Sequence, residues 1–516
     1  FSILENNAMG SVASAAGYMT GGGNMAAVPA LLMVTGVRPD GWGMFFWFAC
    51  IAALGVFAAI PIKRQLVNIE QLPFPSGTAT AETLRALHGT AEGSSKAKLL
   101  TGGAVIGAII AWFRDIKAPW MPFNLPEKYV LPFTIQGIEA KKWTLSVDGG
   151  LLMIGAGMLM SFRTGWSLLL GALLNFGFLA PMMVADGVIK DVSNKAIVQW
   201  SLWGGAAILV SSGLLSFALQ WRMVARSFSE LALLFRPRAA TTARHDPLAD
   251  VECPAWWFPA GFAVLGPIMI FLMVHLFAIP WWAGLVAIPL SIVMGVIAAR
   301  VTGETDVTPT KALGPVTQLV FGGLVPGNIT ANIMSANVTG GVGLHAADLL
   351  TDLKSGFLLG ANPRQQFYAQ MFGVVAGAAI IVPAFNLLVP TADVLGSDKF
   401  PAPSVQVWAG LSKVLVAGID ALHPTARLAV FIGLIVGSVL TVLEKYAPPK
   451  LKPWVPAPSG LGLAFVMPAY NAISMCIGAT IAEIWRRRVN KADETSVPLA
   501  SGFIAGESLM GIVIAI

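Results

Sequence analysis

Three acidic residues could each carry a proton, and one of them lies where a charge is costly. Glu507 stands inside the last apolar run, beside Gly502 and Gly506. Ionisation in apolar surroundings is expensive, so this position favours the neutral acid. Uptake and release of its proton could then be coupled to transport. A neutral glutamate that hydrogen-bonds between helices is the alternative. Asp148 and Glu82 are the other proton-coupling candidates, although Asp148 could instead form a structural pair with Arg163.

Neutral polar residues form a stripe that is typical of a wet surface inside a protein. The stripe consists of Asn328, Asn332, Ser335 and Thr339. Their spacing places them on one face of a helix. Such a stripe either lines a hydrophilic cavity or hydrogen-bonds one helix to another. Near the start of the chain, Glu5, Asn6 and Asn7 form a second polar group. This group could bind an amine, a cation or a peptide backbone, or it could simply begin and cap a helix at the interface.

A helix start bounded by prolines offers a place for an anion. Pro73 and Pro75 cannot continue a helix, and Ser76 after them is a good N-cap. Thr78 and Thr80 follow in the expected first turns. Unsatisfied amides at such a start would face an anion or a carboxylate if the break lies at membrane depth. The alternative is an ordinary capped junction at the surface.

Other polar residues stand beside apolar stretches. Gln366 and Gln370 begin a span after Pro363, where they could cap it or line a cavity, and Tyr470 and Asn471 follow the break at Pro468. A further group consists of His345, Asp348 and Asp352. These three could form a proton-relaying or metal-tuned face, but we interpret them as part of a solvated amphipathic loop.

The elements that position these residues are predicted to be membrane helices. Of 516 residues, 56% are apolar and 12% charged, with a mean hydropathy of +0.72. Apolar runs recur along the chain, among them 42–62, 257–278, 281–299 and 366–388. Because a helical span needs about 20 apolar residues, we predict an all-α polytopic transmembrane helical bundle with about fourteen spans in this chain and about sixteen in the full protein. The net charge of +6 lies in loops and reports topology rather than nucleic-acid binding.

A weak internal repeat predicts two transmembrane halves. Residues 71–89 resemble 399–424, and residues 5–17 resemble 328–341. We expect a first half at 1–220 that lacks two N-terminal spans, a cytoplasmic linker at 221–254 and a second half at 255–516. The halves would be related by an axis along the membrane normal. A substrate cavity between them would be lined by the polar residues named above, Glu5 to Asn7, Ser76, Thr78, Thr80, the stripe and Tyr470 with Asn471.

Four motifs, in order, resemble the oligopeptide transporter (OPT) family, and they look closest to its yellow-stripe-like and prokaryotic branch. They lie at 72–84, 149–158, 354–373 and 500–511. The resemblance implies a proton-coupled importer of small peptides, of modified peptides such as glutathione, or of metal chelates with peptide-like ligands. It implies a multi-pass protein of the plasma membrane, or of the inner membrane in a bacterium. The N-P-G and K-I-P-P-R motifs of the eukaryotic peptide-transporting branch are not seen, which leaves metal-chelate transport open.

We therefore predict a secondary-active importer that is not an enzyme and has no catalytic residue, cofactor or resident metal site. Its expected partners are a small peptide or metal chelate, protons and membrane lipid, and a homodimer is an open alternative to a monomer. The chain has no P-loop G-x-x-x-x-G-K-[ST], so an ion gradient is the expected source of energy. Two other classes remain as alternatives, a passive channel and a membrane-embedded enzyme. An enzyme would need a clustered catalytic group, whereas the five histidines are dispersed along the chain.

Overall fold

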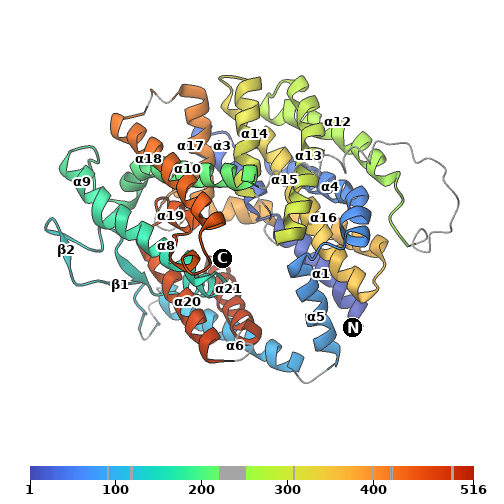
Figure 1. The fold of residues 1–516 in the computed structure, drawn as a ribbon, viewed down its shortest axis with the longest axis horizontal. Helices are drawn as coiled ribbons and strands as arrows, with labels where there is room; N and C mark the ends of the chain where they lie inside the picture. The colour runs from blue at the N-terminus through green and yellow to red at the C-terminus, as the bar shows by residue number, and fades with distance from the viewer. Residues whose placement is uncertain are drawn as a thin grey trace. The chain divides into compact units, whose positions relative to one another are not determined.

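The fold is helical almost throughout in the computed structural model (Figure 1). The structure describes residues 1–89, 92–116, 120–121, 123–219, 251–305, 308, 310–397, 400, 402–418, 420, 422–489 and 493–515. Most of the predicted linker at 221–254 therefore lies outside the described residues. The strands form two small antiparallel ladders, in which β1 (Lys128–Val130) pairs with β4 (Ser146–Asp148) and β2 (Thr134–Ile135) with β3 (Ile138–Glu139).

Eight helical segments of the described residues are long and apolar enough to cross a bilayer. They are Gly41–Ile69, Lys96–Asp115, Phe162–Ala185, Asn194–Ser216, Trp257–Phe277, Trp281–Gly303, Pro363–Leu388 and Pro424–Tyr446. Their apolar surface cannot be hidden in a soluble domain, and helices satisfy their own backbone hydrogen bonds in lipid. The predicted all-α polytopic membrane bundle is confirmed, while the number of spans stays a prediction.

The chain folds into two compact units, and each takes segments from both predicted halves. Unit 1 comprises Phe1–Gly89, Ser216–Leu395 and Val407–Ala421, and unit 2 comprises Thr90–Leu215, Gly396–Gln406 and Leu422–Ile516. The division at 221–254 into two halves stays a prediction about the sequence repeat, and it does not coincide with the borders of the compact units.

Unit 1 is built around one long helix, α15 (Ile329–Leu359). It begins where Asn328 caps it by accepting the Ala331 N–H at 2.9 Å, and it ends at Gly360, whose φ of 75° stops the helix. Nearly every residue between these ends is buried against neighbouring helices. The other elements are α1 (Ile3–Tyr18), α2 (Gly22–Met25), α3 (Ala27–Thr35), α4 (Gly41–Lys63), η1 (Arg64–Ile69), α5 (Pro75–Gly89), α12 (Trp257–Phe277), α13 (Trp281–Thr305), α14 (Thr310–Leu324), α16 (Pro363–Leu388), η3 (Ala392–Val394) and most of α17 (Pro403–Ala417).

In unit 2, helices pack closely against each other at glycines. Its elements, besides the strands, are α6 (Glu92–Asp115), α7 (Leu152–Leu159), α8 (Phe162–Ala172), η2 (Leu173–Leu179), α9 (Ala180–Ala185), most of α10 (Asn194–Leu219), α18 (Pro424–Tyr446), η5 (Lys452–Trp454), α19 (Pro458–Leu463), α20 (Ala469–Arg488) and α21 (Asp493–Ala515). Helix α6 packs on α21 and α7 on α20, while α18 packs on α10 and α19 on α8. A Cβ built on Gly506 would lie 1.9 Å from the Ala104 carbonyl oxygen, and one on Gly433 2.6 Å from that of Gly204. Backbone-to-backbone contact of this kind is typical of membrane helices.

Candidate functional site

A dense group of buried and half-buried polar side chains in unit 1 lies where α1, α15 and α16 meet. We call it the α15 polar cluster, and its members are Asn7, Ser11, Ser14, Asp348, Asp352, Ser355, Gln366 and Gln370. Asp348 accepts hydrogen bonds at both oxygens, from the Ser14 hydroxyl at 2.6 Å and from Nε2 of Gln370 at 2.6 Å. Gln366 donates from Nε2 to the backbone carbonyl of Asp352 at 2.8 Å, and Ser355 donates to Oδ1 of Asn7. Neutral donors from α1 and α16 therefore bind the carboxylate of Asp348, and α16 also binds the backbone carbonyl of Asp352.

The interpretation of His345, Asp348 and Asp352 as part of a solvated loop was wrong. The three lie inside α15, and His345 and Asp348 are buried. His345 contacts the amide nitrogen of Asn24 through Nε2 at 2.7 Å. The sequence signal was present, because Asp348, Asp352 and Ser355 follow helical spacing on one face. Ser11 and Ser14 carry no such signal, since small hydroxyls are common in membrane helices.

Several polar atoms of the α15 polar cluster are buried without a hydrogen-bond partner among the described residues. They are Nδ2 of Asn7, Oδ2 of Asp352, Oε1 of Gln366 and Oε1 of Gln370. Unpaired buried polar atoms cost about 1–3 kcal/mol each, so a group of them marks a place where something else binds or where the arrangement changes.

The predicted stripe on α15 divides into three roles. Asn332 accepts at Oδ1 from Nε2 of Gln318 at 3.2 Å and from the Ser412 hydroxyl at 3.1 Å. This contact joins α15 to α14 and α17, which is the interhelical role given above as the alternative to lining. Asn328 caps the helix, and Thr339 bonds to carbonyls of its own helix. The buried Ser335 hydroxyl has no partner among the described residues.

The polar residues near the start of the chain are placed in separate roles. Glu5 is exposed and closes a capping box with Ser2, while Asn7 belongs to the α15 polar cluster. The first-turn hydrogen bonds, above all the one from the Ser2 backbone N–H, lower the pKa of Glu5. Asn6 contacts Nε2 of the exposed His88 at 2.8 Å.

Helix α5 begins one residue earlier than the predicted cap. Pro75 is its first residue, which suits proline because that position needs no N–H donor, so Ser76 lies in the first turn instead of at the N-cap. The hydroxyls of Thr78 and Thr80 bond to the carbonyls of Pro73 and Ser76, at 2.6 and 2.9 Å. The side chain of Glu82 lies outside the described residues.

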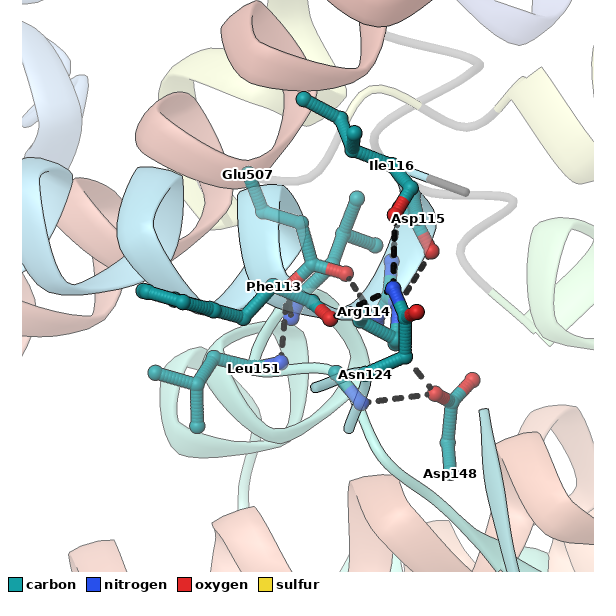
Figure 2. A network of polar contacts seen from close by, with 10 residues as sticks. Phe113, Arg114, Asp115, Ile116, Asn124, Asp148, Leu151 and Glu507 are labelled. Atoms are coloured by element: carbon teal, nitrogen blue, oxygen red, sulfur yellow. Dashed lines mark hydrogen bonds and ion pairs between the residues drawn. The ribbon is translucent and has the colours of Figure 1, made fainter. Parts of the chain in front are cut away.

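In unit 2, Glu507 is the centre of a charged network, which we call the Arg114–Glu507 network (Figure 2). Its Oε1 lies 2.7 Å from Nη1 of Arg114, and its Oε2 accepts the N–H groups of Leu151 and Leu152 at 2.7 and 2.8 Å. These amides form the N-terminus of α7, where a negative charge is favoured. Arg114 also binds Asp115 through Nε at 2.7 Å and Nη2 at 2.8 Å. Arg114 was not among the residues predicted from the sequence.

The position of Gly150 shows how tightly the Arg114–Glu507 network is closed. A Cβ at Gly150 would lie 1.9 Å from Nη1 of Arg114 and 2.3 Å from Oε1 of Glu507. Only glycine leaves room for this ion pair.

The proposed pair between Asp148 and Arg163 does not form. Asp148 lies 3.8 Å from Nη1 of Arg114, and its Oδ1 accepts the Gly150 N–H at 2.8 Å. Arg163 instead pairs with Glu444 at 2.9 Å. Asp148 and Arg163 lie on either side of the same glycine-rich segment in the sequence. In the structure, the helix α7 lies between them along the chain.

Tyr470 and Asn471 are buried at the start of α20. The ammonium group of Lys128 lies 3.8 Å from the centre of the Tyr470 ring, which is a cation–π contact. Within the ranges that the structure covers, no group of three or more His, Cys, Asp or Glu side chains is placed to hold a metal ion.

Comparison with known proteins gives the class of the chain. The family described as "OPT oligopeptide transporter protein" matches residues 1–516. The metal-nicotianamine transporter YSL2 of Oryza sativa subsp. japonica is 28% identical over 495 residues, which cover 91% of this chain and 72% of that protein. The iron-phytosiderophore transporter yellow stripe 1 of Zea mays is 26% identical over 523 residues, which cover 95% of this chain and 75% of that protein.

Proposed function

The chain belongs to the OPT oligopeptide transporter family, and on that premise we propose that it imports small metal chelates of peptide-like ligands across the plasma membrane, driven by protons. Membership of this family and eight apolar helices make the chain a multi-pass membrane transporter and not an enzyme.

One observation supports the substrate class. The relatives described above align with more than nine-tenths of this chain, and they are named as transporters of metal-nicotianamine and iron-phytosiderophore complexes. Proton coupling is supported by the buried acids of both units, because an ionisable group inside a membrane protein is costly and marks proton or ion pathways.

The test is uptake by the purified full chain in proteoliposomes. We expect an iron–nicotianamine complex to accumulate above its external concentration when the outside is acidic, and free glutathione to accumulate less. A protonophore should abolish the accumulation, and protein-free liposomes give the background. Equilibration without accumulation would indicate a passive channel, and accumulation of the peptide alone would contradict the proposed substrate.

A further inference from the structure

We propose that Asp348 and Asp352 together hold the coupling proton of this transporter, between α1, α15 and α16. The inference rests on the proposed function, because it names the site at which that function takes up and releases its proton. It differs from the sequence-based choice of Glu507, Glu82 or Asp148.

The first support is the geometry of the pair. Asp348 and Asp352 are four residues apart in α15, so their side chains project from one face. Ser14 donates to Asp348 at 2.6 Å, and Gln366 donates to the backbone carbonyl of Asp352 at 2.8 Å. Side chains four residues apart on a helix are neighbours. Each carboxylate therefore experiences the charge of the other.

The second support is that no cation balances these charges among the described residues. The basic groups around the α15 polar cluster bind elsewhere: Lys63 pairs with Glu252, Arg300 with Glu70, Arg364 donates to the carbonyl of Glu252, and Arg85 to that of Leu358. On α15 itself, Lys354 lies over the Phe357 ring at 5.9 Å, and His345 contacts Asn24. Two unbalanced negative charges at a buried site are strongly unfavourable, and one proton shared by the pair removes half of that charge.

The third support is an excess of acceptors over donors. Gln370 is fully buried, its Nε2 donates to Asp348, and its Oε1 has no partner among the described residues. Oδ2 of Asp352 and Oε1 of Gln366 also lack donors, whereas Asn7 Nδ2 is the unpaired donor of the cluster. A proton on the pair converts a carboxylate oxygen from a hydrogen-bond acceptor into a donor. The surrounding amide oxygens are acceptors that lack such a donor.

The contacts favour a proton over a metal ion. Both oxygens of Asp348 already accept hydrogen atoms, from a hydroxyl and an amide. A sodium ion would require oxygen atoms turned toward it, and the amide of Gln370 presents its nitrogen to Asp348 instead. Loss of the proton would strengthen the hydrogen bonds from α1 and α16 to Asp348, because hydrogen bonds to a charged acceptor are stronger. Protonation therefore changes how α15 is held by its two neighbours.

The experiment compares Asp348→Asn and Asp352→Asn with wild type in the same proteoliposomes. The matched control is Asp393→Asn, an exposed acid of unit 1. We expect accumulation driven by the pH gradient to fall by about tenfold or more in both variants, while exchange of labelled for unlabelled iron–nicotianamine without a gradient is retained. Asp393→Asn should behave as wild type. Ser14→Ala, which keeps both acids and removes one donor, should shift the pH at which uptake is half-maximal.

An infrared measurement tests the proton without transport. The wild-type chain should show a carboxylic-acid C=O band that is absent from the Asp348→Asn/Asp352→Asn double variant and present in Asp393→Asn. Accumulation retained in the single variants, or an acid band retained in the double variant, would overturn this inference alone. Uptake that follows a sodium gradient and is lost in Asp352→Asn would also overturn it. Wild-type protein without pH-driven uptake would instead overturn the proposed function.

Discussion

Asp348 in unit 1 and Glu507 in unit 2 are both buried acids within apolar helices, yet their partners differ. Glu507 faces the Arg114 guanidinium at 2.7 Å and two N–H groups of a helix start. In the part of the chain that the structure describes, the partners of Asp348 are a hydroxyl and an amide. The first environment supplies a full positive charge opposite the carboxylate. The second supplies none, so the charge of the acid depends on a proton. Burial alone therefore does not identify a proton carrier.

The largest expected effect is the loss of Arg114. Arg114→Met leaves the buried carboxylate of Glu507 and the half-buried carboxylate of Asp115 without their cation, and we expect it to lower the free energy of unfolding by about 3–5 kcal/mol. Chemical unfolding of the detergent-solubilised protein measures this. The control is Arg487→Met, because Arg487 is exposed and pairs with Glu483 on the surface of α20. Similar losses of unfolding free energy in the two variants would show that the Arg114–Glu507 network stabilises the protein no more than a surface ion pair does.

Glu507→Gln should have a smaller effect on stability. Glutamine can still accept the N–H groups of α7 but no longer balances Arg114, which keeps Asp115 as a partner. We expect a loss of about 1–3 kcal/mol in the free energy of unfolding. Accumulation driven by the pH gradient, counted per folded molecule, should persist. Its disappearance, with exchange retained, would reverse the comparison and make Glu507 the proton carrier.

Asp352→Asn should change stability least among the buried acids. Asparagine is neutral and has nearly the same shape as the protonated acid, so we expect the free energy of unfolding to change by less than about 1 kcal/mol. The same unfolding assay measures it beside Glu507→Gln. A loss as large as that of Arg114→Met would mean that Asp352 acts as a fixed charge.

Glu5 provides an exposed acid for comparison. Its capping hydrogen bonds hold its pKa below the ordinary value of 4.5. Their contribution to the stability of the first turn of α1 is therefore complete above pH 4.5, and it is lost as the pH falls through the lowered pKa. Hydrogen exchange of the first turn of α1, corrected for the intrinsic rate, should show loosening only under such acid conditions. Glu5→Gln should remove this pH dependence, and equal dependence in both proteins would contradict it.

The fold class could be predicted from the sequence because hydropathy reports directly on lipid exposure. The start of α5 was predicted to within one residue, because proline and serine both favour a helix start, whereas Asn328 was predicted as part of the stripe and not as the cap of α15. The partners of the buried acids were not accessible. Arg114 and Glu507 are almost 400 residues apart, and no local rule relates them. Asp348 and Asp352 were assigned to a loop because their charges resemble a solvated face when the covering helices α1 and α16 are unknown.

The interleaved composition of the two units has a consequence for biosynthesis. Unit 1 needs residues from Phe1–Gly89 and from as far along as Val407–Ala421, and unit 2 needs the C-terminal residues. Neither unit can be completed while the ribosome is still making the second half of the chain. Early helices must therefore wait in the bilayer for late partners, with the polar side chains of α1 uncovered. A nonsense mutation near the middle of the gene would leave two unfinished units instead of one intact and one missing, which makes such a fragment a substrate for membrane proteases.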